Sequence, residues 1–599
     1  MKLIKDFIKK YFQYFAYFYS HLKYRIFISL TLSLFVGVLD GFGLAMFLPL
    51  LQMADGSSQE VDTEQLGNLS FLVDGISAIG IPFNLYSVLL IILFFFTFKG
   101  IMKFLEGFLR TVYQQFFIKN IRIKNTESLA HFSYNNYVNA DSGRIQNTFT
   151  GEVERVNGAY RAYFMAIQAA VLVLVYVILA FLSNPQFALL ITIGGALSNL
   201  LFKKLYAATK KRSRRLTNEM HSFQGLLIQK ITNFKYLKAT ALIYDYAEKL
   251  KKNIIHIEKS QKIIGVLSAT LQSMREPITM FIVVTVIIVQ VEFFGGGLGL
   301  IILSLLFFYR ALTFLMSMQN QWNNFLGVSG SLDNMTAFST ELKLGAEKFG
   351  KEKFDKFDHQ LTVSDLSFSY PGIKILDNIS FSIHKNETIA IVGGSGSGKT
   401  TLVNILVGLL KPESGYVEID NLKMREMDIR TFQSKIGYIT QEPVIFNDTI
   451  FNNICFWEEK NEQNLRRFHN AIEEASMFEF LNALEKKEET ELGNNGINLS
   501  GGQRQRISIA RELYKDVEFL VMDEATSALD SETEKAIQEN IEALKGKYTI
   551  ITIAHRLSTI KNADKIILLN KGKIDKVGRF DELIDLSPTF KRMVNLQEF

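Results

Sequence analysis

Residues 389–402 have the composition of a phosphate-binding loop. A short apolar run typical of a buried strand leads into Gly393, and the spacing G-x-x-x-x-G-K-[ST] closes at Gly398, Lys399 and Thr400, where a helical pattern begins. Glycines let backbone N–H groups approach phosphate oxygens, the lysine reaches the β- and γ-phosphates, and the threonine hydroxyl ligates Mg²⁺. The candidate phosphate-binding residues are Gly393, Gly394, Ser395, Gly396, Ser397, Gly398, Lys399, Thr400 and Thr401.

A second apolar run, residues 519–522, ends in the carboxylates Asp523 and Glu524. Asp523 is suited to holding Mg²⁺ directly or through water, and Glu524 is suited to polarising an attacking water. Such a strand end often just meets solvent. Because a phosphate loop lies upstream in the same half of the chain, the pair instead predicts hydrolysis of a nucleoside triphosphate.

A third motif, Ser500-Gly501-Gly502-Gln503, precedes a long helical pattern. Serine and two glycines at a helix N-terminus form a second anion site, although an ordinary helix cap has the same composition. One nucleotide is not expected to occupy both the phosphate loop and this motif of the same domain. The motif therefore predicts that a second copy of the chain supplies the other half of each site.

These motifs all lie in the second half of the chain, and the chain as a whole is unusually apolar. Hydrophobic residues make up 48% of its 599 positions and the mean hydropathy is positive, which indicates a membrane-embedded part. The net charge of +6 is modest and its cations gather in particular loops, so no nucleic-acid partner is expected. Cys455 is the only cysteine, which excludes an intramolecular disulfide.

The first half of the chain contains apolar stretches of membrane-spanning length, which is about 20 residues. Residues 3–24 mix aromatic residues with lysines, which favours an amphipathic helix at the membrane surface over a signal peptide. The six predicted spans are residues 26–53, 81–109, 162–183, 186–206, 263–292 and 299–326. We therefore expect a multidomain protein: an all-α transmembrane domain with six helices over residues 1–344, a charged linker at 345–358, and an α/β phosphate-loop domain over 359–599.

The positive charges predict the orientation of these spans. Residues 54–84, 183–186 and 293–297 contain no lysine or arginine, whereas the other connections are rich in both. By the positive-inside rule the cation-free loops face outward and both termini are cytoplasmic.

Charged residues inside the spans are candidates for contact with a substrate, because each is costly in the bilayer unless it faces protein or water. Asp40 lies in the first span, and the cations Lys99, Arg275 and Arg310 lie in later ones. Pairing with Asp40 or snorkelling to the interface would explain some of these cations. Arg275 and Arg310 are the stronger candidates for an inner cavity, and a dimer would double them.

With these residues in view, the chain from about residue 361 onward resembles the nucleotide-binding domain of ATP-binding cassette (ABC) transporters. The resemblance implies that Tyr370 stacks on adenine and that Gln441 senses Mg²⁺ and the attacking water. It also implies that residues 500–503 cap the γ-phosphate of the opposite subunit's ATP, that Asp530 couples the two sites, and that His555 is the switch histidine.

The membrane half resembles the exporter type of this family, in which six spans precede one nucleotide domain and two chains form the transporter. Two positions depart from the family pattern. Arg144 stands where the first cytoplasmic loop usually has an acidic residue, and Asn494 with Asn495 replaces a frequent Glu-Arg pair. The resemblance implies a homodimer in the inner membrane of a bacterium, which uses ATP and Mg²⁺.

We therefore interpret the chain as an ATP-driven exporter or flippase that moves an amphipathic, anionic, lipid-linked substrate by alternating access. Asp40 and Phe42 ahead of Pro49, and the pair Lys99-Gly100, resemble features of bacterial lipid-linked oligosaccharide flippases. Lipid A-type flippases, multidrug exporters and peptide exporters are the alternatives; a peptidase domain ahead of the spans, expected of processing peptide exporters, is not seen. A membrane-bound ATPase without transport is the rival from another class.

Overall fold

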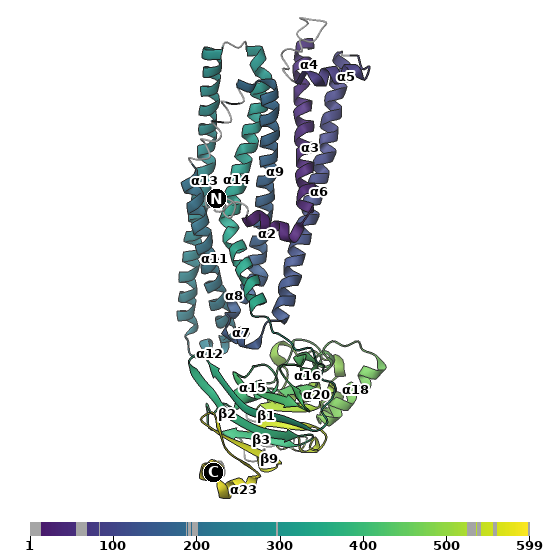
Figure 1. Cartoon of the computed structure of the whole chain (residues 1–599), viewed down its shortest axis with the longest axis vertical. Coiled ribbons are helices and arrows are strands. Elements are labelled where there is room, and N and C mark those ends of the chain that lie inside the picture. The colour runs from purple at the N-terminus through teal and green to yellow at the C-terminus, as the bar shows by residue number, and fades with distance from the viewer. Residues whose placement is uncertain are drawn as a thin grey trace. The chain divides into compact units, whose positions relative to one another are not determined.

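The computed structural model describes residues 13–54, 69–82, 84–186, 189, 193, 202–294, 298–523, 535, 539, 541–554 and 560–596. These residues form two compact units (Figure 1). The first is helical and runs to residue 132 and then over 139–346. The second comprises residues 133–138 and everything from 347 onward.

The helices of the first half are long. Asn84 caps the N-terminus of α6 by accepting a hydrogen bond from the Ser87 amide at 2.9 Å, and α6 then continues for 46 residues. At 1.5 Å per residue this is about 70 Å, more than twice the hydrocarbon thickness of a bilayer, so each long helix extends beyond the membrane. The helices are α2 (Gln13–Leu22), α3 (Arg25–Ala45), α4 (Phe47–Ala54), α5 (Phe71–Ala78), α6 (Leu85–Ala130), α7 (Tyr134–Asn139), α8 (Ser142–Asn147), η2 (Thr148–Glu152), α9 (Val153–Ser183), α11 (Lys203–Thr232), α12 (Phe234–Ala239), α13 (Ile243–Phe294) and α14 (Leu298–Leu344).

The described helix α2 belongs to the segment that was predicted to be amphipathic. Tyr14, Phe18 and Leu22 recur every four residues and therefore share one face, and all three are buried. Phe18 packs on Phe117 of α6 and on Tyr163 of α9, with ring centroids 5.4 Å and 4.9 Å apart. The apolar face of α2 is thus covered by other helices of its own unit.

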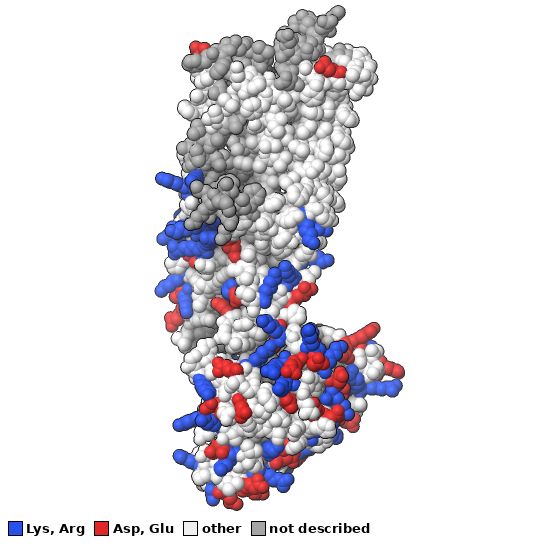
Figure 2. All heavy atoms as spheres, in the orientation of Figure 1, with Lys and Arg blue, Asp and Glu red and all other residues white. Residues whose placement is uncertain are grey.

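Four of the described helical segments are long and apolar enough to cross a membrane: Arg25–Met53, Leu85–Ala130, Ser142–Ser183 and Ile243–Val289. They contain all of the first and third predicted spans and most of the second and fifth, of which residues 81–84 and 290–292 fall outside the segments. The sixth lies in α14. Most of the fourth, residues 186–206, lies outside the described residues. Figure 2 shows a face with few charged side chains along these helices and a cluster of lysines and arginines over α11 and α13.

The second unit contains two sheets. A 4-stranded sheet has the order β2-β1-β4-β5, and a 6-stranded sheet has the order β10-β9-β3-β8-β7-β6. In the larger sheet β9, β3, β8, β7 and β6 are parallel, which explains why their sequences are continuous apolar runs rather than alternating ones. The strands are β1 (Gln360–Tyr370), β2 (Ile373–His384), β3 (Thr388–Gly393), β4 (Ser414–Ile419), β5 (Leu422–Lys423), β6 (Ile436–Ile439), β7 (Phe519–Asp523), β8 (Thr549–Ile553), β9 (Lys565–Asn570) and β10 (Lys573–Gly578).

Helices cover this sheet and connect its strands. The core packs Ile389 and Ile391 of β3 against Leu402 and Ile405 of α15, all fully buried. The helices are α15 (Lys399–Leu406), α16 (Ile429–Gln433), α17 (Ile450–Cys455), α18 (Glu462–Glu474), α19 (Phe478–Ala483), η3 (Lys487–Glu489), η4 (Asn494–Gly496), α20 (Gly501–Tyr514), α23 (Phe580–Leu586) and α24 (Pro588–Asn595).

The segment that was predicted as a charged linker is fastened to the second unit from residue 347 onward. The amide of Gly350 donates to the Met427 carbonyl at 2.9 Å, and the Asp428 amide donates to the Glu352 carbonyl at 2.7 Å. Phe357 is fully buried, with its ring centroid 4.6 Å from that of Phe519 in β7. Charge alone does not reveal this packing, since the aromatic residues make the contacts.

Candidate nucleotide-binding site

The parallel strands bring the candidate catalytic motifs to one edge of the larger sheet. β3 ends at Gly393, β7 at Asp523 and β6 at Ile439. The carboxyl ends of β3, β8, β7 and β6 are aligned in register. Their Cα partners there are Ile391 with Ile553, Ile553 with Asp523, and Met522 with Ile439. Ligands of open parallel sheets bind at this edge.

Two glycines give the phosphate loop its backbone path. Gly393 has φ 156° and Gly398 has φ 101°, values that other residues rarely adopt. A Cβ atom on Gly393 would lie 2.3 Å from the Leu569 carbonyl oxygen, and one on Gly398 would lie 2.7 Å from Leu376. Glycine is therefore required at both positions by the close approach of neighbouring strands, in addition to any requirement of a ligand.

The side chains of the loop fit an anion. Lys399 is the first residue of α15 and is 7% exposed, and its Nζ donates to the carbonyls of Gly393 and Gly394 at 2.9 Å and 3.0 Å. The buried Ser397 hydroxyl has no hydrogen-bond partner among the described residues. The loop thus combines the Lys399 ammonium, the Ser397 hydroxyl and the N-terminus of α15, and its glycines have no Cβ that would keep a ligand away from the backbone. This combination suits the phosphates of ATP. Thr400, in the first turn of α15, and the half-buried Thr401 follow directly.

The residues expected near a metal ion lie around the same edge. Asp523 closes β7, and Gln441 follows the end of β6 by two residues. Burial raises the pKa of Tyr438 in β6 to about 12, and the negative charge of Asp523 adds to this rise. Within the described part of the chain no three His, Cys, Asp or Glu residues cluster as a metal site. The hydroxyl, amide and carboxylate oxygens of Thr400, Gln441 and Asp523 suit Mg²⁺ held partly by phosphates and water.

The serine-glycine motif forms the start of α20. Ser500 is the N-cap: its Oγ accepts from the Gln503 amide at 3.2 Å, while Gln503 Oε1 accepts from the Ser500 amide at 2.8 Å. Gly501 is half-buried and Gly502 is buried. Ser500 itself is exposed. Within the second unit, the start of α20 is therefore accessible to a ligand or to another chain.

The remaining candidates divide between described and undescribed positions. Tyr370 ends β1 and is half-buried, with its ring edge-on to Phe368 at a centroid distance of 5.1 Å. Glu524, Asp530 and His555 lie outside the described residues.

In the helical unit, Lys99 is paired with Asp40. The Lys99 Nζ lies 2.5 Å from Asp40 Oδ1, and the Tyr176 hydroxyl donates to the other carboxylate oxygen. Arg310 is within electrostatic range of that hydroxyl, and Phe314, one turn further along α14, stacks on the Tyr176 ring at 5.5 Å. α3, α6, α9 and α14 thus meet at one polar cluster. Nothing in the local sequence marks Tyr176 as functional, since it is one polar-tipped aromatic residue within an apolar run.

Arg275 lies elsewhere, between α13 and α11. It is 3% exposed, and among the described residues none of its three guanidinium nitrogens has a hydrogen-bond partner, with the Tyr206 side chain as a polar neighbour. Its Cζ lies 5.9 Å from the ring centroid of Phe202, just before α11 begins. An uncompensated buried guanidinium is unusual, because burying an unpaired charge is expensive.

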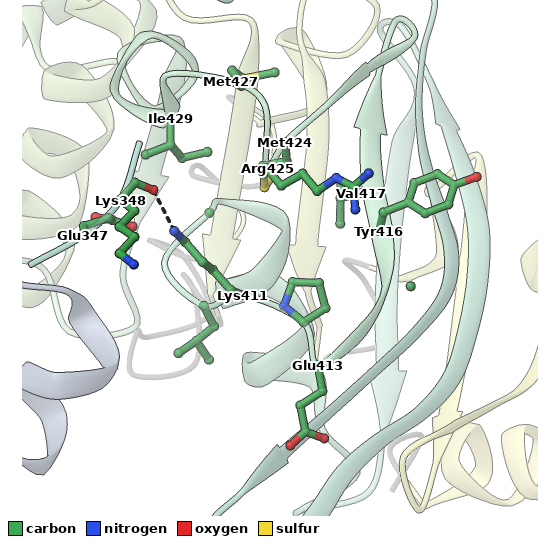
Figure 3. A pocket seen from close by; sticks show the side chains of 14 residues that line it. Glu347, Lys348, Lys411, Glu413, Tyr416, Val417, Met424, Arg425, Met427 and Ile429 are labelled. Atoms are coloured by element: carbon green, nitrogen blue, oxygen red, sulfur yellow. Dashed lines mark hydrogen bonds between the residues drawn. The ribbon is translucent and has the colours of Figure 1, made fainter. Parts of the chain in front are cut away.

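A separate pocket of about 280 Å³ lies where the linker crosses β4 and the residues that follow α15 (Figure 3). Lys411 Nζ donates to the Lys348 carbonyl across it at 2.8 Å. Burial raises the pKa of Glu347 at its rim, and the charge of Lys411 opposes that rise. None of the candidate nucleotide-binding residues lines this pocket.

The architecture defines a class: a bundle of membrane-spanning helices followed by a phosphate-loop ATPase domain. Two family models match, the ABC transporter transmembrane region over residues 26–321 and the ABC transporter over residues 376–527. The chain belongs to the ABC transporter family. It is an exporter-type ATPase with an ATP-binding domain, as the sequence indicated.

Several relatives cover most of the chain. An ATP-dependent lipid A-core flippase of Francisella novicida is 30% identical over 464 residues, 76% of this chain and 78% of the relative. A protein of the same name from Paraburkholderia xenovorans is 27% identical over 516 residues, covering 83% of this chain and 84% of its own length. The fold matches a bacterial Atm1-family ABC exporter with ATP bound, with TM-score 0.79 and 19% identity over 96% of this chain and 100% of the other.

Proposed function

We propose that this ABC transporter is a homodimeric exporter or flippase that hydrolyses MgATP to move an anionic, lipid-linked amphiphile across the cytoplasmic membrane. The observation that carries the cargo class is Arg275, a buried guanidinium that forms no hydrogen bond with the described residues. A phosphate or pyrophosphate head group would supply the missing acceptors.

In the nucleotide domain, each residue of the edge has a role in this proposal. Lys399 and residues 393–401 hold the phosphates, and Tyr370 stacks on adenine. Thr400, Gln441 and Asp523 would hold Mg²⁺, which neutralises charge on the β- and γ-phosphates when bound. Glu524 polarises the attacking water, and His555 contacts the γ-phosphate end of the site.

The second copy completes each site. Residues 500–503 of one chain close on the phosphate loop of its partner, and Asp530 couples the two sites. The capping box uses the backbone N–H groups of Ser500 and Gln503. The N–H groups of Gly501 and Gly502, at the exposed start of α20, can face such a phosphate. Closure around ATP would change the membrane helices from inward-open to outward-open.

The membrane orientation follows the distribution of cations. The loop at 54–84 and the turns at 183–186 and 293–297 lack lysine and arginine and face outward in this proposal, and both termini are cytoplasmic. The relatives named lipid A-core flippases support a bacterial inner membrane and a lipid cargo.

Within the helical unit, the two arginines carry the cargo contact, since Lys99 is engaged by Asp40. We expect Arg275→Ala or Arg310→Ala to lower the apparent affinity for an anionic lipid by about tenfold or more, because each loses charge-assisted hydrogen bonds of roughly 1.5–3 kcal/mol. Basal ATPase activity should persist, since the chemistry lies in the other unit.

The test is lipid-stimulated ATPase activity of the full chain in nanodiscs. The arms are polyprenyl-pyrophosphate-linked sugars, lipid A and neutral hydrophobic compounds. Arg122→Ala is the matched control, because Arg122 forms an exposed pair with Glu154 that contributes little. Stimulation by neutral compounds alone, unchanged in both arginine variants, would overturn the anionic cargo and favour a drug-type exporter.

A further inference from the structure

Arg511, near the C-terminal end of α20, is a buried cation that joins three segments of the second unit. It is 3% exposed. Its Nη1 donates to the Val444 carbonyl at 2.7 Å, its Nε to the Asn453 carbonyl at 2.6 Å, and its Nη2 to Asn453 Oδ1 at 3.1 Å. One side chain therefore ties α20 to α17 and to the loop that leaves Gln441.

Two aromatic rings enclose the same guanidinium. Its Cζ lies 5.3 Å from the ring centroid of Phe446 and 5.4 Å from that of Phe456. Cation–π contacts of this kind are strongest when the cation is desolvated, as it is here. Phe456 has φ 49°, a backbone conformation that a bulky residue rarely adopts.

Asn453 closes the loop from the other side. It is fully buried, its Oδ1 accepts from the Phe446 amide at 2.8 Å, and its Nδ2 donates to the carbonyls of Phe446 and Thr449 at 3.0 Å each. The loop of residues 440–449, which we name the Gln441 loop, is thus fixed at its middle to both α17 and α20. Gln441 precedes the bonded residues Val444 and Phe446 in the same loop.

We propose that Arg511 is a positioning residue for Gln441, making the Gln441 loop and α20 move as one body. The inference rests on the proposed role of Gln441 at Mg²⁺ and the attacking water. Ser500 caps the opposite end of α20, about 16 Å away at 1.5 Å per residue. Hence the approach of Ser500 to the partner's nucleotide also sets the position of Gln441 in its own site.

The chemistry of arginine suits this role. Its planar fork serves several carbonyl acceptors at once, whereas a lysine presents one compact charge. Separating the Gln441 loop from α20 would break the bond from Arg511 to the Val444 carbonyl and leave part of a buried guanidinium without an acceptor, which is costly. ATP binding is assigned to Tyr370 and the phosphate loop, whereas the hydrogen bonds of Arg511 go to Val444 and Asn453, so ATP affinity should be insensitive to Arg511.

The first measurement is steady-state ATPase kinetics of Arg511→Lys in the full chain in nanodiscs. We expect kcat to fall about tenfold, with the KM for ATP within about twofold of wild type, because two of three charge-assisted bonds are lost while the cradle is intact. Arg467→Lys is the matched control. Arg467 also donates to a carbonyl, that of Tyr514 at 2.8 Å, and lies 4.3 Å from the Tyr514 ring centroid, but on α18.

The second measurement separates positioning from general stability. In a Gln441→Ala background, Arg511→Lys should lower kcat no further. Phe456→Leu, at a ring that is 41% exposed and therefore tolerant, should lower kcat less than Arg511→Lys and should also have no effect in that background.

The outcomes are distinguishable. A lowered kcat in Gln441→Ala, with a further loss of similar size on adding Arg511→Lys, overturns the inference alone. Wild-type kcat in Gln441→Ala overturns the assigned role of Gln441 and the inference with it. A parallel loss in Arg467→Lys would show that the effect belongs to packing around α20 rather than to the Gln441 loop.

Discussion

Asp40 is a buried charge of the helical unit that has a cationic partner, and its pairing with Lys99 can be tested by a double-variant rescue. The residue is 3% exposed and is held by Lys99 and Tyr176. Lys99→Met would leave the carboxylate with one neutral donor. Removing one partner of a buried pair costs about 3–5 kcal/mol, and we expect the lower end because the Lys99 side chain is 20% exposed.

The double variant Lys99→Met with Asp40→Asn shows whether the loss of stability comes from an unpaired Asp40 carboxylate. Asp40→Asn removes the charge but keeps an acceptor for Tyr176, so adding it to Lys99→Met should recover most of the loss. The two changes should therefore be non-additive by about 2–3 kcal/mol, within the range for residues in direct contact. Tyr176→Phe alone should cost about 1.5–3 kcal/mol, because it removes a hydrogen bond to a charged group.

The assay is thermal unfolding of the full chain in nanodiscs, followed as apparent Tm. Lys203→Met, at an exposed lysine that begins α11, is the control for losing a cation at the helix surface. If Lys99→Met is as stable as Lys203→Met, or if the double variant is no more stable than Lys99→Met, the buried pair does not exist as described.

Three other changes test the nucleotide domain and its linker. Glu524→Gln should abolish ATP turnover while a fluorescent ATP analogue still binds; near wild-type turnover would remove Glu524 from its role. In mixed dimers, Ser500→Arg on one chain with Lys399→Ala on the other should leave one site active, whereas both changes on one chain should spoil both sites; equal activity would contradict head-to-tail pairing. Gly350→Ala should lower the apparent Tm by an amount equivalent to about 1–3 kcal/mol, because its Cβ would lie 2.1 Å from the Glu426 backbone, and an unchanged Tm would contradict the docked linker.

The phosphate loop is the part that local sequence could predict in most detail. Gly393, Gly398 and Lys399 have their positions because of backbone conformation and spacing within a few residues, and the structure has the expected strand, loop and helix around them. The same holds for the cap at Ser500, where residue types three positions apart form the bonds.

Long-range pairings could not be predicted in the same way. The sequence allowed Asp40 to pair with a lysine or an arginine, but Lys99 is 59 positions away, and its choice depends on how α3 packs on α6. Arg511 carried no signal at all, because its partners are backbone carbonyls, which every residue possesses. The burial of Phe357 in the linker likewise depends on β7, far along the chain.

ATP-dependent lipid translocation in proteoliposomes is the direct test of the proposed transport. The full chain would be reconstituted with a fluorescent polyprenyl-pyrophosphate-linked sugar, and the fraction of label moved between leaflets would be measured with and without ATP. The account predicts ATP-dependent movement that is absent in Glu524→Gln and reduced in Arg275→Ala. Intact ATPase activity without movement of any anionic lipid, lipid A included, would contradict transport of this cargo class and leave a membrane-bound ATPase or an exporter of neutral compounds.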